Sequence, residues 1–206
     1  MKNLFKAPLG IPAYALLCFG AGALGSFSMA PYDLWPLLVI SLSFLYIAIL
    51  KSPSPRAAFF YGWLFGFGYF LFGLSWVGNA LLVDGNPYAW AWPLAVCGLP
   101  FILSFFPAFA MALARRFANL AYPLGYVSFT AFFALMEWLR GNIFTGFPWN
   151  LFGYTWGSFL PMVQSVALAD VYFLTWLTII WAALPGFLLA TKSKEKIPLT
   201  AFAVLS

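Results

Sequence analysis

Two oppositely charged side chains, Glu137 and Arg140, lie together inside an otherwise apolar part of the sequence. Because they are three residues apart, they share one face of a helix and can form an ion pair. Ionisable groups at membrane depth are costly, and they usually pair with each other or serve a function there. Two interpretations follow: Arg140 binds a phosphate group of a ligand, or the two residues form a structural ion pair that braces two helices.

The residues that follow this pair are rich in glycine, proline and aromatic side chains. Gly141, Gly146 and Pro148 interrupt the helix, so we expect an irregular loop there. Large aromatic rings suit the headgroup depth of a membrane and can line a groove for acyl chains, although they also fit an ordinary aromatic belt. The candidate substrate-binding residues are Glu137, Arg140, Gly146, Phe147, Trp149 and Tyr154.

The composition indicates the fold class that positions this stretch. The chain of 206 residues is 64% hydrophobic and 7% charged, whereas a soluble domain carries about 25% charged residues. We therefore expect an all-α, polytopic membrane helix bundle. The chain has no histidine, the commonest metal ligand, so we expect no metal site and no cofactor. Cys18 and Cys97 lie in apolar runs, where we expect buried thiols and no disulfide.

Six apolar stretches are candidates for membrane spans. A seventh apolar run, 197–206, is about half the length that a spanning helix needs, so we expect that the chain is cut inside a seventh span. The alternative is a short interfacial helix at the C-terminus. The six expected spans cover approximately 11–30, 37–50, 57–83, 90–114, 122–139 and 162–190.

The basic residues indicate how the spans are oriented. With a cytoplasmic N-terminus, every lysine and arginine except Arg140 falls on the cytoplasmic side of these spans. This distribution follows the positive-inside rule, and it puts residues 137–156 at the opposite, outer face. Because the basic residues are scattered between apolar spans, the net charge of +5 indicates topology and not nucleic-acid binding.

With the stretch 137–156 at the outer face, a family resemblance becomes specific. The chain resembles the N-terminal membrane region of bacterial apolipoprotein N-acyltransferases over essentially its whole length. The matching stretches are APYDLWP at 30–36, GFG at 66–68 with WV at 76–77, EWLRG at 137–141, TGFPW at 145–149 and FGY at 152–154.

The resemblance implies an acyltransferase of the bacterial inner membrane, with residues 137–156 at the periplasmic face. In this family a nitrilase-like periplasmic domain carries a Glu-Lys-Cys catalytic set. The cysteine takes an acyl chain from a phospholipid as a thioester and passes it to the N-terminal amine of a diacylglyceryl-cysteine lipoprotein. That domain is expected to follow the seventh span and is missing here, so no catalytic residue is carried over. We expect this chain to contribute anchorage and lipid guidance and to be inactive alone.

Two other interpretations remain open. The chain is a non-catalytic membrane subunit of a split enzyme, or it is a small multi-span transporter. A transporter predicts paired ionisable groups or broken helices near the middle of the bilayer, ideally in two related halves. We find no internal repeat, and the candidate charges cluster at one face. The sequence does not indicate the preferred phospholipid or the oligomeric state.

Overall fold

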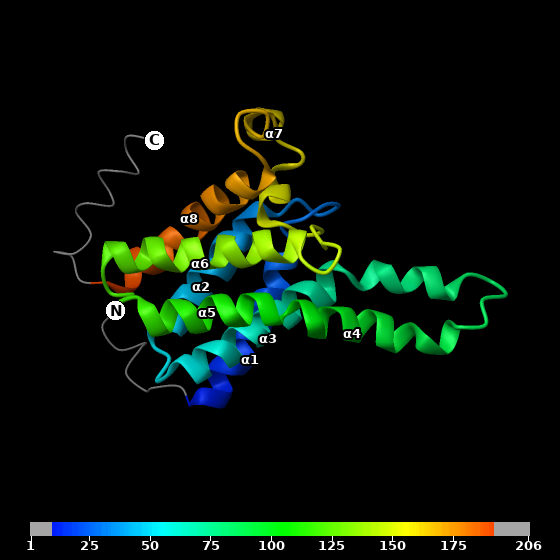
Figure 1. The fold of residues 1–206 in the computed structure, drawn as a ribbon, viewed down its shortest axis with the longest axis horizontal. Helices are drawn as coiled ribbons and strands as arrows, with labels where there is room; N and C mark the ends of the chain where they lie inside the picture. The colour runs from blue at the N-terminus through cyan, green and yellow to red at the C-terminus, as the bar shows by residue number, and fades with distance from the viewer. Residues whose placement is uncertain (1–9, 192–206) are drawn as a thin grey trace.

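The computed structural model describes residues 10–191, and this part of the chain is helical with no strand (Figure 1). The expected all-α fold class is confirmed. The α-helices are α1 (Ile11–Ser26), α2 (Trp35–Leu50), α3 (Pro55–Gly73), α4 (Trp92–Leu103), α5 (Phe105–Phe117), α6 (Pro123–Asn142), α7 (Leu160–Ser165) and α8 (Val171–Ala190). The short 3-10 helices are η1 (Ser75–Leu82), η2 (Ala89–Ala91) and η3 (Phe152–Trp156).

Proline and polar caps set where the helices begin. Six of the eight α-helices in the described part of the chain have a proline in their first two positions, where its missing N–H costs no hydrogen bond. Two helices carry a side-chain cap: α3, which also starts with a proline, and α8. Ser54 accepts a hydrogen bond from the amide of Ala57 at 3.2 Å, and Asp170 accepts one from the amide of Phe173 at 2.7 Å.

The six longer helices form a closed ring. Each packs against two neighbours, in the order α1, α2, α8, α6, α5, α3 and back to α1. The α1–α3 contact is close because Gly22 faces the backbone of Phe65, where any Cβ would overlap. Tyr46 of α2 fills the inside of the ring, and its hydroxyl donates to the carbonyl of Leu120. The helices α4 and η1 extend together beyond this ring, to the right in Figure 1.

Within residues 10–191, two helical stretches are long and apolar enough to cross a membrane, Ala89–Phe117 and Val171–Ala190. The stretch Pro55–Gly73 with Ser75–Leu82 makes a third if the bent pair is one span, and α1 and α2 are apolar but shorter. The chain therefore has the helices of a membrane protein. The count of six spans stays a prediction, and the seventh, at 197–206, lies outside the described residues.

Two of the expected spans take a different course from the one predicted. The stretch 57–83 is bent by 45° where α3 gives way to η1. The stretch 162–190 is not one helix, because α7 ends at Ser165 and α8 begins at Val171. The Asp170 side chain binds the backbone amide that α8 leaves unpaired at its start, so it marks a helix terminus and not a helix interior.

Candidate functional site

Glu137 and Arg140 form a buried ion pair in the last two turns of α6. Nη2 of Arg140 lies 2.7 Å from Oε2 of Glu137, and Nε lies 3.3 Å from Oε1. Glu137 is 2% exposed and Arg140 is 1% exposed. The guanidinium also lies over the ring of Phe70, with Cζ 4.9 Å from the ring centroid. The expected pairing is confirmed. Both partners lie on α6, and the guanidinium contacts Phe70 of α3, so a structural role that braces two helices stays a prediction.

The third nitrogen of the Arg140 guanidinium, Nη1, binds the loop that follows α6. Nη1 donates to the carbonyl of Phe147 at 2.6 Å and to the carbonyl of Trp149 at 2.8 Å. The amide of Phe147 in turn donates to the carbonyl of Arg140 at 2.8 Å. We call these interactions of Glu137, Arg140, Phe147 and Trp149 the loop clamp. Buried carbonyls need a partner, and a guanidinium can serve several acceptors at once.

The loop itself has an unusual backbone. Phe144, Thr145, Gly146 and Asn150 all have positive φ angles, between 53° and 78°. Gly146 is the residue that suits this conformation, and a Cβ there would overlap the carbonyl oxygen of Gly141. Positive φ is uncommon for Phe and Thr, although Asn tolerates it. The clamp and the surrounding contacts must therefore hold Phe144 and Thr145 in this conformation.

A second side chain fixes the far end of the loop. The hydroxyl of Tyr69, from α3, donates to the carbonyl of Asn150 at 3.2 Å. Tyr69 is buried, and its ring packs against that of Phe152 with centroids 5.0 Å apart. The loop is therefore attached both to the helix that precedes it and to α3, which is far away in the sequence.

The clamp directs two aromatic side chains outward and one inward. Trp149 is 55% exposed, and its ring meets that of Trp76 edge to face with centroids 6.0 Å apart. Tyr154 is 43% exposed, whereas Phe147 is partly buried against the core. Burial raises the pKa of the Tyr154 phenol, the Tyr172 phenol raises it further, and Arg140 opposes the rise. Tyr154 is therefore protonated at neutral pH and can donate a hydrogen bond.

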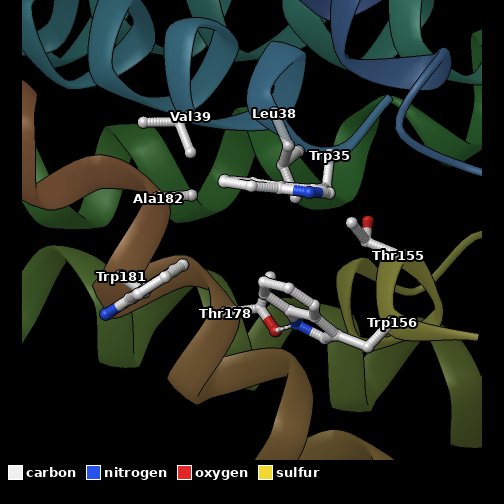
Figure 2. Close-up of a pocket in the computed structure, with 8 residues that line it drawn as sticks. All are labelled: Trp35, Leu38, Val39, Thr155, Trp156, Thr178, Trp181 and Ala182. Carbon is white, nitrogen blue, oxygen red and sulfur yellow. Dashed lines mark hydrogen bonds between the residues drawn. The ribbon is translucent and has the colours of Figure 1, made fainter. Parts of the chain in front are cut away.

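Three tryptophans gather beside the loop, around a hollow between α2, η3 and α8 (Figure 2). The ring of Trp156 lies 6.1 Å from that of Trp35 and 5.9 Å from that of Trp181, centroid to centroid. Nε1 of Trp156 donates to Oγ1 of Thr178 at 2.8 Å. The hollow measures about 10 Å³, room for one water molecule, so it is a packed joint that attaches η3 to α2 and α8.

The sequence interpretation missed several residues near the site. Trp76 packs on Trp149, and Trp35 packs on Trp156. Both Trp76 and Trp35 lie in stretches that match the family, but the sequence does not show that they contact the loop region. Trp181 lies in an apolar helix and gave no signal. One cysteine also differs from expectation. Cys18 is buried, but Cys97 is exposed, because α4 extends beyond the ring and packs on few neighbours.

Comparison with known proteins connects this geometry to a family. The domain family described as "Apolipoprotein N-acyltransferase N-terminal domain" matches residues 21–202. A protein of that name from Rhodopseudomonas palustris is 39% identical over 201 residues, which cover 93% of this chain and 37% of the relative. One from Brucella suis is 42% identical over 186 residues, covering 84% of this chain and 34% of the relative. This chain thus spans about a third of the length of these relatives, and it belongs to the family of apolipoprotein N-acyltransferase N-terminal domains.

Proposed function

We propose that this chain is the membrane part of an enzyme that N-acylates lipoproteins. The enzyme moves an acyl chain from a phospholipid to the N-terminal amine of a diacylglyceryl-cysteine lipoprotein. Support comes from the name of the relatives and from their identity to this chain over most of its length. The relatives extend well beyond the part that this chain matches, and acyl transfer is assigned to residues outside these 206.

The described cysteines agree with this division of labour. A covalent acyl transfer by cysteine needs a thiolate beside a base and a polar site for the developing charge. Cys18 is buried in α1, and Cys97 lies on the apolar helix α4, distant in sequence from Glu137 and Arg140. We therefore assign anchorage and lipid guidance to this chain, and we do not assign either thiol to catalysis.

Lipid guidance is assigned to the loop of residues 144–154. The observation that carries this proposal is the loop clamp, in which a buried ion pair holds the backbone while the Trp149 ring stays exposed beside Trp76. Trp149 and Tyr154 contact the lipid in this proposal, because an exposed indole and a protonated phenol suit the boundary between acyl chains and headgroups. The other candidates, Glu137, Arg140, Gly146 and Phe147, hold these two in place.

The location follows from charge. We propose that the chain lies in the bacterial inner membrane with its N-terminus in the cytoplasm and the loop at the periplasmic face. The basic residues support this orientation, because Arg140 alone lies at the loop end and its charge is paired with Glu137. A lipid anchored in the outer leaflet would then meet the loop directly.

The experiment replaces Trp149 by Ala in an enzyme that contains these residues and follows acyl transfer from phospholipid to a diacylated lipopeptide. We expect a loss of turnover with unchanged membrane insertion and abundance, and Trp149→Phe should retain much of the activity. Trp90→Ala is the matched control, because Trp90 is 71% exposed and lies in η2, away from the clamp. Normal turnover in Trp149→Ala would sink the proposal.

A further inference from the structure

A second hollow lies at the other end of α6 from the loop clamp. It measures about 540 Å³ and is formed where α5 ends and the chain turns into α6, against the end of α2. In Figure 1 this turn lies at the left end of the bundle, and the clamp loop lies at the right. Among the residues that the structure describes, the hollow is lined by Leu50, Arg115, Arg116, Phe117, Ala118, Asn119 and Leu120, so the polar lining within residues 10–191 is basic or neutral and contains no carboxylate.

The two arginines of this hollow are held differently. Nε of Arg115 donates to the carbonyl of Ser52 at 3.0 Å, which attaches the end of α5 to the turn before α3 and fixes the guanidinium at the rim. Arg116 is exposed, and its guanidinium lies over the Phe117 ring at 5.3 Å from the centroid. A guanidinium has five N–H donors, so each arginine has further N–H groups beyond these contacts that can donate to a ligand.

Polar and apolar groups lie side by side at this rim. The side chain of Asn119 accepts a hydrogen bond from the amide of Ala121 at 3.3 Å, which leaves its amide N–H groups as donors. Phe117 is 68% exposed next to the arginines. In a membrane protein, an exposed ring beside guanidinium groups matches an amphipathic ligand, with an anionic group for the arginines and an apolar chain for the ring.

We propose that this hollow binds the phosphodiester headgroup of an anionic phospholipid. Planar guanidinium groups pair with phosphate oxygens through two parallel hydrogen bonds, which suits Arg115 and Arg116 at one rim. The ring of Phe117 packs on the upper part of an acyl chain. The bound lipid is structural and distinct from the acyl donor, since the hollow and the clamp loop lie at opposite ends of α6.

A simpler explanation exists for basic residues at this position. Cations at a helix C-terminus balance the helix dipole, and cations at a membrane surface set the orientation of the chain. That explanation gives every exposed arginine of this end the same affinity for anionic lipid. Arg56 separates the two explanations, because it is exposed in the first turn of α3 at the same end and does not line the hollow.

The test measures lipid retained by the detergent-purified chain in native mass spectrometry, with phosphatidylglycerol and phosphatidylcholine offered in equal amounts. We expect retention of phosphatidylglycerol by the unmodified protein. Arg116→Ala should lower its affinity about fivefold, the contribution of one surface arginine, and Arg116→Glu should lower it further. Arg56→Ala is expected to match the unmodified protein, with thermal unfolding as the check on folding in all three variants.

Two results would overturn the proposal. Equal losses in Arg116→Ala and Arg56→Ala, or no loss in either, would mean that the hollow is not a specific site. Displacement of phosphatidylglycerol by an excess of inorganic phosphate would mean that the arginines bind a free anion and that the lipid assignment is wrong. Retention of the lipid in the presence of phosphate, together with the expected order of variants, supports a lipid site. Loss of acyl transfer in the Trp149 experiment is independent of all these outcomes.

Discussion

Nη1 of Arg140 donates a hydrogen bond of 2.8 Å to the backbone carbonyl of Trp149. One of the most buried cations of the protein thus fixes the backbone of one of its exposed indoles. The charge of Arg140 is balanced by Glu137 one turn earlier on α6. The ion pair therefore determines the backbone course of the loop. Variants of Glu137 and Arg140 should lower the stability of the protein by different amounts, according to whether the loop keeps its donor.

Replacement of Arg140 should destabilise the protein more than replacement of Glu137. Arg140→Ala leaves the Glu137 carboxylate buried without a counter-charge and deprives two carbonyls of their donor, so we expect a loss of about 3–5 kcal/mol in the free energy of unfolding. Glu137→Ala should cost less, because Arg140 keeps both carbonyls and its contact with Phe70. Thermal or denaturant unfolding in lipid nanodiscs measures the difference.

The double variant is the control for this explanation. Glu137→Ala with Arg140→Ala leaves no unpaired charge in the core, so it should be more stable than Arg140→Ala alone. A double variant as unstable as the sum of the two single losses would mean that the two side chains act independently, against the clamp.

Gly146 should not tolerate a side chain. Gly146→Ala forces an alanine into φ +78°, where a left-handed conformation costs about 1–2 kcal/mol, and its Cβ would overlap the Gly141 carbonyl. We expect a lower unfolding midpoint and faster proteolytic cleavage of the loop. Gly98→Ala is the matched control. Among the described residues, a Cβ at Gly98 in α4 would meet no packed neighbour within 4 Å, so alanine there should be neutral or stabilising. Equal behaviour of the two variants would contradict the strained course of the loop.

A double-mutant cycle can test the hydrogen bond between Trp156 of η3 and Thr178 of α8. Trp156→Phe removes the indole N–H that donates to Thr178, and Thr178→Val removes the acceptor. We expect a coupling energy of about 0.5–1.5 kcal/mol between the two changes, measured by unfolding in detergent. A coupling energy of zero would show that this hydrogen bond does not help to attach η3 to α8.

Local chemistry allowed part of this site to be predicted from the sequence. The spacing of Glu137 and Arg140 predicts their pairing, because three residues on a helix bring two side chains to one face. The glycines and the proline after Arg140 predict the irregular loop, and prolines mark most helix starts. These features depend on residues close together in the chain.

Contacts between distant residues could not be predicted in this way. That Arg140 holds the carbonyls of Phe147 and Trp149 depends on how the loop folds back, and this course depends in turn on Tyr69 of α3. Nothing in the sequence between Ser165 and Val171 distinguishes a helix break from a helix interior except Asp170, whose capping role needs the break to be known. The course of the loop and the break before α8 depend on tertiary packing, which the spacing of apolar residues does not reveal.

The most direct test of the account is an acyl-transfer assay on this 206-residue chain in lipid, beside a longer protein that contains it. The assay follows loss of an acyl group from phospholipid and its appearance on a diacylated lipopeptide. We predict no transfer by the chain alone and transfer by the longer protein. Transfer by the chain alone would contradict it, and the chemistry would then have to come from Glu137, Arg140 or a membrane cysteine.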